Sequence, residues 1–374
     1  MQSQYAQCKF AQNIKKRIMD NIALIVGASG ISGNNLAQEL LKNNWTTYGI
    51  TRKSEVKLKG LKNIKADLLD PKSLKEALRE VKPTHVFFTA WMRKETEAEN
   101  IEVNSALVRN LLEVLSPKKS VKHVALVTGL KHYLGPFDNY VSEGFSPETP
   151  VRTEHPRLPL NNFYYAQEDE LFEASKRDGF TWSVHRAHTV IGQAVGNLMN
   201  MGTTLAIYAS ICKENGMPFI WPGSEAQWNG ISDVTDAHIL AKHFVWAATT
   251  PKAENEAFNI VNGDVFRWSW LWKQIAEYFD IEYQGYVENN RSLEELMKND
   301  TTVWREIAGK HQLVEPQLDR LASPWHTDLD LRRPIEVMTD MSKSRKLGFK
   351  EYQDTRESFF NLFDKLKEQK IIPA

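Results

Sequence analysis

Hydrophobic residues occur in the first half of the chain as short runs that are separated by amphipathic stretches. Residues 22–26 form an entirely apolar run, which is typical of a strand buried in a parallel sheet. Residues 34–43 have the spacing of an amphipathic helix. Further strand candidates are residues 46–50, 84–89, 124–128 and 182–185, and further helix candidates are residues 71–81 and 100–115. Strands that alternate with helices predict an α/β fold with a doubly wound parallel sheet.

A glycine-rich turn, Val26-Gly-Ala-Ser-Gly-Ile-Ser-Gly33, follows the first apolar run. A glycine at the strand exit allows a sharp turn, the second allows backbone amides to approach a pyrophosphate, and the third allows close packing of the next helix. The N-terminus of that helix attracts the anion. The G-x-x-G-x-x-G spacing is a weak motif, but the strand before it and the helix after it predict a dinucleotide site on a Rossmann-type fold. The expected cofactor-binding residues of this turn are Gly27, Ser29, Gly30, Ile31 and Gly33.

Two basic residues indicate which nicotinamide cofactor is bound. The second strand candidate is followed by Arg52 and Lys53, where NAD sites usually carry an acidic residue that binds the ribose hydroxyls. Cationic side chains suit a ribose phosphate instead, so the sequence predicts NADP(H), with solvated loop charges as the alternative. We expect Asp67 and Leu68 beside the adenine. The alternative for these two is a turn at a helix N-terminus, running from Asp67 to Asp70.

The pattern loosens after about residue 195, where proline, glycine and tryptophan become more frequent. We therefore expect an N-terminal extension over residues 1–19 and an NADP-binding Rossmann domain over residues 20–195. Residues 196–374 are expected to form a smaller mixed region that mostly binds substrate or forms a lid and is interwoven with the Rossmann core. Such a region belongs at the carboxyl edge of the sheet, where doubly wound folds bind ligands.

Composition narrows the classes of partner. Among the 374 residues, 47 basic side chains balance 47 acidic ones, so no overall field attracts nucleic acid or an anionic membrane. No apolar stretch is long enough to span a bilayer. Two cysteines cannot form a disulfide framework and favour a reducing compartment. We expect a cytoplasmic protein with a small-molecule substrate and no nucleic-acid, membrane or metal partner; His185 and His188 lack a suitably spaced third ligand.

The catalytic pair of an ordinary short-chain dehydrogenase is absent from its expected place. Tyr-x-x-x-Lys occurs only ahead of the first strand, in residues 5–9. In Asn-Phe-Tyr-Tyr-Ala-Gln-Glu-Asp, residues 162–169, Tyr164 is followed four positions later by Glu168, and a carboxylate cannot replace the lysine. Lys131, just past the strand candidate 124–128, is a cation that could reach the same edge of the sheet. Taken singly, Tyr164 could be an aromatic core residue and Lys131 a solvated loop charge.

Two long motifs carry a resemblance to a known family: Thr-Gly-Leu-Lys-His-Tyr-Leu-Gly-Pro-Phe at residues 128–137, and residues 162–169. Together with the glycine turn and residues 84–91, 182–186, 200–212 and 341–349, they extend over nearly the whole chain. The chain resembles the progesterone 5β-reductase / iridoid synthase-like (PRISE) reductases, which are atypical members of the short-chain dehydrogenase/reductase superfamily.

The resemblance implies site residues. Lys131 and Tyr164 match the catalytic positions, and the substrate-binding positions are Trp91, Lys131, Phe137, Tyr164 and Met199. The implied cofactor contacts beyond the glycine turn and its neighbours are Ala90, Trp91, Thr128, Tyr164, Val190, Asn197, Leu198 and Met199. The chain departs from its relatives in residues 187–192, where the family's Pro-Gly-Asn-Ile-Phe-Gly is Ala-His-Thr-Val-Ile-Gly. We expect this change to affect loop shape and substrate preference, whereas Val190 keeps the aliphatic residue whose backbone meets the carboxamide.

The implied reaction is the NADPH-dependent reduction of the C=C bond of α,β-unsaturated carbonyl compounds, that is, of enones and enals. Hydride adds to the β-carbon, and Tyr164 and Lys131 stabilise the enolate oxygen. One alternative is a carbonyl reductase or alcohol dehydrogenase of the short-chain family, which the displaced lysine disfavours. Another is a nonenzymatic NADP(H)-sensing protein, which the presence of both Lys131 and Tyr164 disfavours. Assembly as a homodimer is compatible with each of these.

Overall fold

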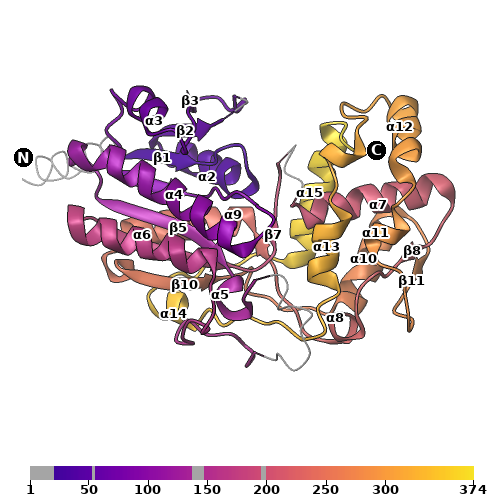
Figure 1. Cartoon of the computed structure of the whole chain (residues 1–374). Helices are drawn as coiled ribbons and strands as arrows, with labels where there is room; N and C mark the ends of the chain where they lie inside the picture. Colours follow the sequence, from indigo (N-terminus) through magenta and orange to yellow (C-terminus); the bar gives the residue numbers. More distant parts are fainter. Residues whose placement is uncertain (1–20, 53–54, 137–146, 195–198) are drawn as a thin grey trace, which may run out of the picture. The chain divides into compact units, whose positions relative to one another are not determined.

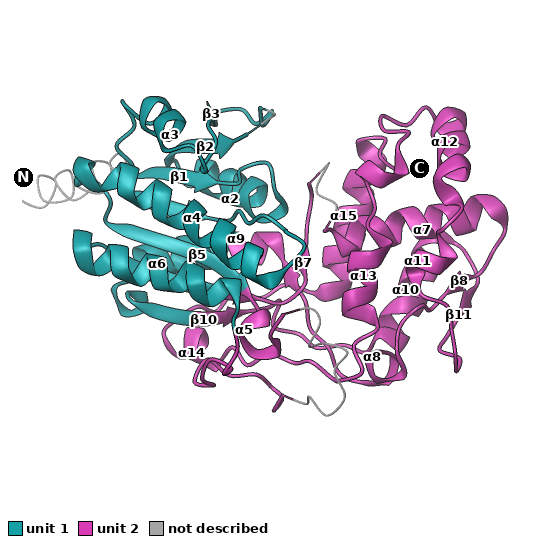
Figure 2. Ribbon diagram, viewed as in Figure 1, with its two compact units in different colours: residues 1–128, 161–185, 241–257 teal, residues 129–160, 186–240, 258–374 magenta. Residues whose placement is uncertain are grey.

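The computed structural model describes residues 21–52, 55–136, 147–194 and 199–374. The chain divides into two compact units, coloured separately in Figure 2. Unit 1 comprises residues 1–128, 161–185 and 241–257, and unit 2 comprises residues 129–160, 186–240 and 258–374. The polypeptide therefore crosses from one unit to the other several times, and neither unit is a single stretch of sequence.

Unit 1 is built on a seven-stranded sheet with the order β10-β6-β5-β4-β1-β2-β3. Strand β1 pairs in parallel with β2 and with β4, and the parallel pairing continues from β2 to β3 and from β4 to β5. The strands are β1 (Ile22–Val26), β2 (Thr46–Thr51), β3 (Lys62–Lys65), β4 (His85–Phe88), β5 (His123–Gly129), β6 (Thr181–Ala187) and β10 (Glu256–Ile260). The chain reverses direction across the sheet at β1, which makes the carboxyl ends of β1 and β4 the point where such folds bind ligands. The doubly wound Rossmann-type prediction is confirmed.

Helices cover both faces of this sheet because its central strands are apolar on both sides. The helices are α2 (Ile31–Lys42), α3 (Pro71–Ala77), α4 (Glu97–Leu115), α6 (Phe163–Asp178) and α9 (Ala237–Thr249). Figure 1 shows α4 and α6 side by side over one face, where Leu111 and Leu171 enter a core with Val86. On the other face, Phe87 of β4 meets Phe244 of α9, with 6.0 Å between ring centroids.

Unit 2 is mainly helical among its described residues. Its helices are α5 (Lys131–Leu134), α7 (Met201–Asn215), α8 (Glu225–Asn229), α10 (Trp268–Phe279), α11 (Leu293–Leu296), α12 (Asp300–His311), α13 (Pro324–Leu331), α14 (Ser342–Lys346) and α15 (Thr355–Glu368). Two short parallel pairs accompany them, β7 (Val190–Ile191) with β9 (Thr235–Asp236) and β8 (Phe219–Ile220) with β11 (Tyr283–Gln284).

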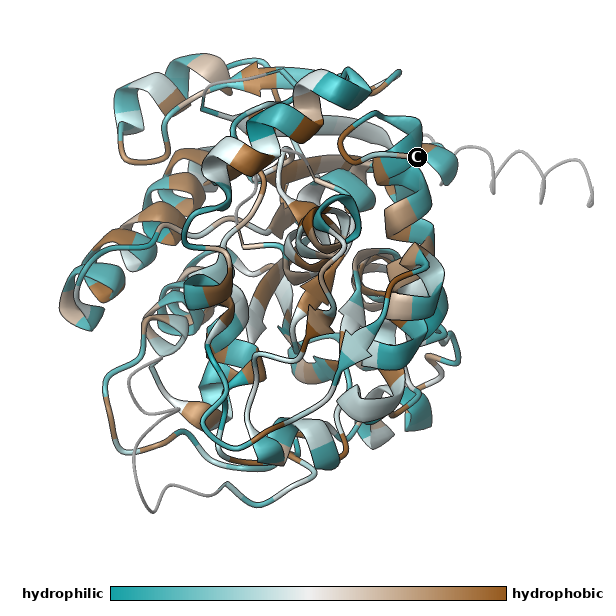
Figure 3. Cartoon of the chain, turned by 90° about the vertical axis from the view of Figure 1, so that its right-hand side faces the viewer, coloured by the Kyte–Doolittle hydropathy of each residue, from teal (hydrophilic) through white to brown (hydrophobic). Residues whose placement is uncertain are grey.

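Large rings form the core of unit 2. Phe219 stacks on Trp272 with 3.9 Å between centroids and 9° between planes, and Trp221 meets Trp272 edge-on. Both tryptophans are fully buried, so they provide core area. Figure 3 shows how hydropathy is distributed in the chain: apolar residues lie along the strands, and hydrophilic residues alternate with apolar ones along the helices.

Candidate active site

At its three glycines, the turn of unit 1 presents backbone groups and no side chain. Gly27 has φ +83°, in the left-handed region that suits glycine. A Cβ on Gly33 would lie 2.2 Å from the carbonyl oxygen of Gly27, so only glycine fits where the helix meets the strand. Gly30 is the N-cap of α2 and makes no side-chain capping hydrogen bond, which leaves the first amides of that helix available to an anion. This cradle fits a pyrophosphate.

The ends of β2 and β3 provide the neighbouring positions. The Gly27 amide donates to the carbonyl of Ile50 at 3.2 Å, which holds the turn against the end of β2. Arg52 follows directly and is exposed, with its NH1 3.7 Å from Met92 Sδ. Lys53 lies outside the described residues. Arg52 thus lies at the end of the strand that holds the turn, and a guanidinium is a group that suits a ribose phosphate.

The alternative interpretation of Asp67 also has support from the geometry. Its Oδ1 accepts the amide of Leu69 at 3.0 Å, and Asp70 caps α3 by accepting the amides of Lys72 and Ser73. Leu68 is buried in the core of unit 1, so only its backbone could face an adenine. The segment is therefore a structured turn at the start of α3, and it remains at the ligand-binding edge of the sheet.

The loop after β4 carries Ala90 and Trp91, and two asparagines of α4 fix it. Asn104 accepts the Met92 amide through Oδ1 and donates to the Met92 carbonyl through Nδ2, both at 2.8 Å. Asn100 accepts the Lys94 amide at 2.8 Å. Sequence reasoning missed both residues, although two asparagines one turn apart on the buried side of a predicted helix were a usable signal.

Tyr164 lies in the first turn of α6, which is held at its start by two side chains. Asn162 is the N-cap and accepts the Tyr164 amide at 2.9 Å. Glu97 of α4 accepts the Phe163 amide at 2.8 Å, so the positive end of the α6 dipole faces a carboxylate. Phe163 stacks on Trp91, with 5.3 Å between centroids and 16° between planes, and Tyr164 packs beside it at 4.4 Å.

This environment keeps Tyr164 protonated. Burial, and after it the Glu97 carboxylate, raises the pKa of the Tyr164 phenol above its ordinary value of 10.0. A neutral phenol is a hydrogen-bond donor, and a phenolate is not. Part of the Tyr164 side chain remains accessible, whereas Tyr165 is buried in the core. The two neighbouring tyrosines therefore differ in burial, with Tyr164 partly exposed and Tyr165 buried.

Lys131 begins the short helix α5 of unit 2, directly after β5. It is buried, with 6% of its surface exposed, so it is not the solvated loop charge that the sequence left open. The Leu130 amide donates to the Ala187 carbonyl at 3.2 Å, which ties the start of α5 to the end of β6. The Tyr133 hydroxyl donates to Asn259 at 2.6 Å and anchors the helix further. Thr128, the preceding cofactor candidate, is buried near the end of β5 in unit 1.

The remaining candidates lie on the segments between β6 and α7 in unit 2. Val190 opens β7 and pairs with Thr235 of β9. Met199 is half-buried and precedes Asn200, which caps α7 and donates to the Gly192 carbonyl at 2.9 Å. Three predicted site residues, Phe137, Asn197 and Leu198, lie outside the described residues. The predicted site residues are divided between the units: the glycine turn, Trp91 and Tyr164 belong to unit 1, and Lys131, Val190 and Met199 belong to unit 2.

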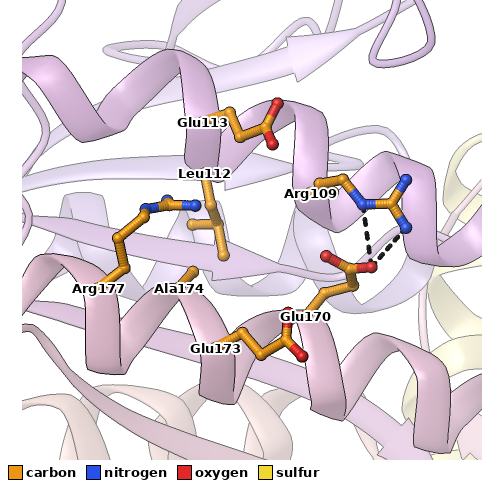
Figure 4. Close-up of a pocket in the computed structure, with 7 residues that line it drawn as sticks. All are labelled: Arg109, Leu112, Glu113, Glu170, Glu173, Ala174 and Arg177. Carbon is orange, nitrogen blue, oxygen red and sulfur yellow. Dashed lines mark hydrogen bonds and ion pairs between the residues drawn. The ribbon is translucent and has the colours of Figure 1, made fainter.

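A second surface feature of unit 1 does not suit this chemistry. A groove between α4 and α6 is lined by Arg109, Leu112, Glu113, Glu170, Glu173, Ala174 and Arg177. Figure 4 shows Arg109 reaching across it to Glu170, whose Oε1 accepts from Arg109 Nε at 3.0 Å. The groove lies along the C-terminal halves of both helices, away from the α6 N-terminus that carries Tyr164. Its walls are charged, and a pocket for an enone should be mostly apolar.

The described part of the chain contains no group of three or more His, Cys, Asp or Glu residues arranged to bind a metal ion. In the same residues, no helix combines the length and the apolar character needed to cross a bilayer.

Comparison with known proteins identifies a family and several relatives of this chain. Residues 60–373 match the family described as the PRISE-like Rossmann-fold domain. The chain is 38% identical to the 3-oxo-Delta(4,5)-steroid 5-beta-reductase of Arabidopsis thaliana, and the alignment covers 98% of this chain and 97% of that protein. It is also 38% identical to an (S)-8-oxocitronellyl enol synthase of Nepeta cataria, with the same coverage of 98% and 97%.

Solved structures agree on the fold. An epimerase from Methanothermobacter thermautotrophicus superposes with a TM-score of 0.69 at 16% identity, over 94% of each chain. The UDP-glucose 4-epimerase of Thermus thermophilus, solved with NAD, gives a TM-score of 0.62 at 18% identity over 92% of this chain and 98% of that one. Identities this low show the shared Rossmann fold alone.

Proposed function

The chain belongs to the family of PRISE-like Rossmann-fold proteins, as its motifs predicted, and from this membership we propose that it is an NADPH-dependent enone reductase. The substrate class is α,β-unsaturated carbonyl compounds, and the bond reduced is C=C. The names of both plant relatives fit this chemistry, since one is a reductase of a 3-oxo-Δ(4,5) steroid and the other forms an enol. An enol is the protonated form of the enolate that conjugate hydride addition leaves.

The cofactor site is assigned to the glycine turn. The turn offers amides at the uncapped N-terminus of α2 to a pyrophosphate, and glycine is the only residue that fits at Gly33. Arg52 beside it favours the ribose phosphate of NADPH over the free hydroxyls of NADH. When bound there, NADPH supplies the hydride. The protein residues bind the cofactor, orient the substrate and stabilise charge.

The observation that carries the proposal is the position of Tyr164 in the first turn of α6. Two hydrogen bonds hold this turn, and the Tyr164 ring lies beside Phe163, which stacks on Trp91. A donor fixed in this way needs little reorganisation when negative charge develops on a carbonyl oxygen. The high pKa of Tyr164 suits an oxyanion donor that keeps its proton. We assign Lys131, the other catalytic position that the family resemblance implies, as the positive charge that stabilises the same oxygen.

The residues with these roles would then belong to different units. Unit 1 would bind the nucleotide and carry Tyr164 and Trp91, and unit 2 would provide Lys131, the Val190 and Met199 segments, and most of the substrate pocket. The domain boundaries expected from the sequence, with a Rossmann domain over residues 20–195 and a substrate-binding region over residues 196–374, stay a prediction. So do the homodimer, which analytical ultracentrifugation can test, and the cytoplasmic location, which fractionation can test.

The test is NADPH consumption with a small cyclic enone, followed by identification of the product. The saturated ketone is expected. If the allylic alcohol is the only product, the protein is a carbonyl reductase and the proposal fails. Tyr164→Phe should lower kcat by roughly 10²- to 10³-fold while NADPH binding is retained. Tyr165→Phe is the matched control and should keep nearly full activity. Unchanged turnover of Tyr164→Phe would remove this residue from the mechanism.

A further inference from the structure

The segment between β6 and Val190 is surrounded by buried polar side chains that the proposed function does not use. His188 lies with its Nδ1 2.7 Å from Asp233 Oδ1 and its Nε2 2.8 Å from Arg333 NH1. The side chains of His188, Asp233 and Arg333 are 4%, 1% and 5% exposed. Buried polar groups at these distances are hydrogen-bonded, because a buried polar group without a partner destabilises the fold.

The partners of His188 fix its protonation. A guanidinium can only donate hydrogen bonds, so His188 Nε2 must be the acceptor from Arg333. Nδ1 then carries the proton and donates to Asp233. Asp233 is held in turn by Thr339, whose amide donates to Oδ2 at 2.7 Å. The imidazole is therefore neutral, and its orientation is set from both sides.

The network closes on itself through the next residue in the chain. Arg333 forms an ion pair with Asp330. Asp330 accepts a hydrogen bond from the Thr189 hydroxyl at 2.8 Å. The path from His188 through Arg333 and Asp330 to Thr189 thus returns to the peptide bond that joins 188 to 189. Two consecutive residues are held by one ring of side chains from α13 and the turn that follows it.

The held dipeptide leads directly into β7. The Thr235 amide donates to the Thr189 carbonyl at 3.0 Å, and Val190 pairs with Thr235. The segment leaves β6 at the carboxyl end of the strand, the edge at which doubly wound sheets bind their ligands. All of these residues belong to unit 2. A backbone that must meet a ligand at this edge needs a fixed conformation, and the side-chain ring provides one.

We propose that the ring of His188, Arg333, Asp330 and Thr189 is a clamp that positions the Val190 segment for the nicotinamide end of NADPH. This inference rests on the proposed function. His188 and Thr189 are positioning residues in it, because they act through the Val190 backbone and touch no reacting atom. Two members of the clamp, His188 and Thr189, lie within residues 187–192, where the family resemblance leads us to expect a different loop shape.

The experiment distinguishes binding of the nicotinamide end of the cofactor from binding of its adenosine end. Thr189→Val removes one hydrogen bond at nearly constant volume, and His188→Ala removes the imidazole. For each variant, NADPH binding is measured by nicotinamide fluorescence, and adenosine 2′,5′-bisphosphate binding by calorimetry. We expect a roughly 10- to 100-fold loss of kcat/KM and weaker NADPH binding, because small displacements of a positioned group have effects of this size. The bisphosphate, which lacks the nicotinamide, should bind as it does to the wild type.

A matched pair on α13 provides the control. Asp330→Asn weakens the ring, whereas Asp328→Asn alters a carboxylate that accepts the amides of Leu293 and Glu294 at 2.8 and 2.9 Å instead. Only the Asp330 variant should affect NADPH. Equal losses for NADPH and the bisphosphate, equal losses in both aspartate variants, or no loss in Thr189→Val and His188→Ala would each overturn the clamp.

The clamp and the proposed function can fail separately. If the wild type binds no NADPH, the proposed function fails. Hydrogen exchange of residues 189–192 still tests the clamp in that case, because Thr189→Val should raise the exchange rate there and Asp328→Asn should not. Unchanged exchange in Thr189→Val would show that the ring does not hold the segment.

Discussion

The two units bury histidines in opposite ways. In unit 1, Ser183 Oγ lies 2.9 Å from His123 Nε2 and 2.8 Å from His185 Nε2, and His185 Nδ1 lies 2.7 Å from His243 Nδ1. In unit 2, His188 lies between the carboxylate of Asp233 and the guanidinium of Arg333. The partners are uncharged side chains in unit 1 and two opposite charges in unit 2.

The difference shows how each unit meets the cost of burying a polar group. Neutral hydrogen bonds join the imidazoles of unit 1, and burying a proton on any of them would be costly. In unit 2 a carboxylate and a cation fix one neutral tautomer. The core of unit 1 should therefore lose stability when its histidines are protonated, whereas we propose that His188 of unit 2 fixes the conformation of a loop.

The largest difference between the units should appear in acid. Burial lowers the pKa of His123 and His243 to about 3, and burial together with Lys122 lowers that of His85 to about 4. The pKa of His185 is also lowered well below 6.5, first by burial and then by His243. Below pH 6.5 these histidines take up protons in the unfolded chain but not in the folded chain. Their contribution to the free energy of unfolding is therefore complete above pH 6.5 and is lost between about pH 6.5 and 3. His85, His123 and His243 should each cost about 2 kcal/mol at pH 5.

Guanidinium unfolding followed by fluorescence from pH 7.5 to 5 measures this loss. His123→Asn should reduce the slope of unfolding free energy against pH, because one proton fewer is taken up on unfolding. His238→Asn is the control, since the His238 side chain is 43% exposed. A stability that does not change over this range would contradict the comparison.

The next largest effect is expected at the glycine turn of unit 1, where backbone groups are proposed to bind the cofactor. Gly33→Ala places a Cβ 2.2 Å from a carbonyl oxygen of the glycine turn. We expect a loss of about 1–3 kcal/mol of stability from overpacking and the loss of NADPH binding. Gly309→Ala in α12 is the control, because no atom lies within 4 Å of its added Cβ, and it should leave cofactor binding unchanged. Normal NADPH affinity in Gly33→Ala would move the cofactor site away from this turn.

A smaller effect should separate the charge of Arg52 from the backbone contacts around it. Arg52→Ala should raise the KM for NADPH roughly 10- to 100-fold and leave that for NADH unchanged, since a hydrogen bond to a charged group contributes about 1.5–3 kcal/mol. Initial rates with both cofactors measure the ratio. Arg79→Ala removes another exposed arginine and should change neither value. If both cofactors lose equally, Arg52 does not bind the ribose phosphate.

The smallest effect is expected at Glu97. Glu97→Gln removes the charge beside Tyr164 and can retain an oxygen acceptor for the Phe163 amide. The pKa of Tyr164 should fall, so the loss of activity at alkaline pH should begin at a lower pH, by less than about one unit. Glu99→Gln, in the same turn of α4, should leave the profile unchanged. An alkaline limb that stays in place in Glu97→Gln would mean that burial alone sets the acidity of Tyr164.

Sequence patterns predicted the central elements of unit 1 well. The apolar run at residues 22–26 is β1 at the same bounds, and the other predicted strands appear within two residues at each end. The missed strands are β3 and β10, at the two edges of the sheet. Three of the four residues of β3 are exposed, so no apolar run could mark it. Helix α4 begins at Glu97, earlier than predicted, because a capping box joins Thr96 to Glu99.

What the sequence determined by itself was local: the glycine turn, the order of strands and helices, and the two motifs that hold Lys131 and Tyr164. These features need only neighbouring residues, because backbone geometry and hydrophobic period repeat over short distances. The tertiary structure alone decided that Glu97 meets Phe163, 66 positions away, and that Arg333 meets His188, 145 positions away. Side-chain hydrogen bonds between distant segments leave no period or spacing in the sequence. Their partners are chosen by the fold, which must satisfy every polar group that it buries.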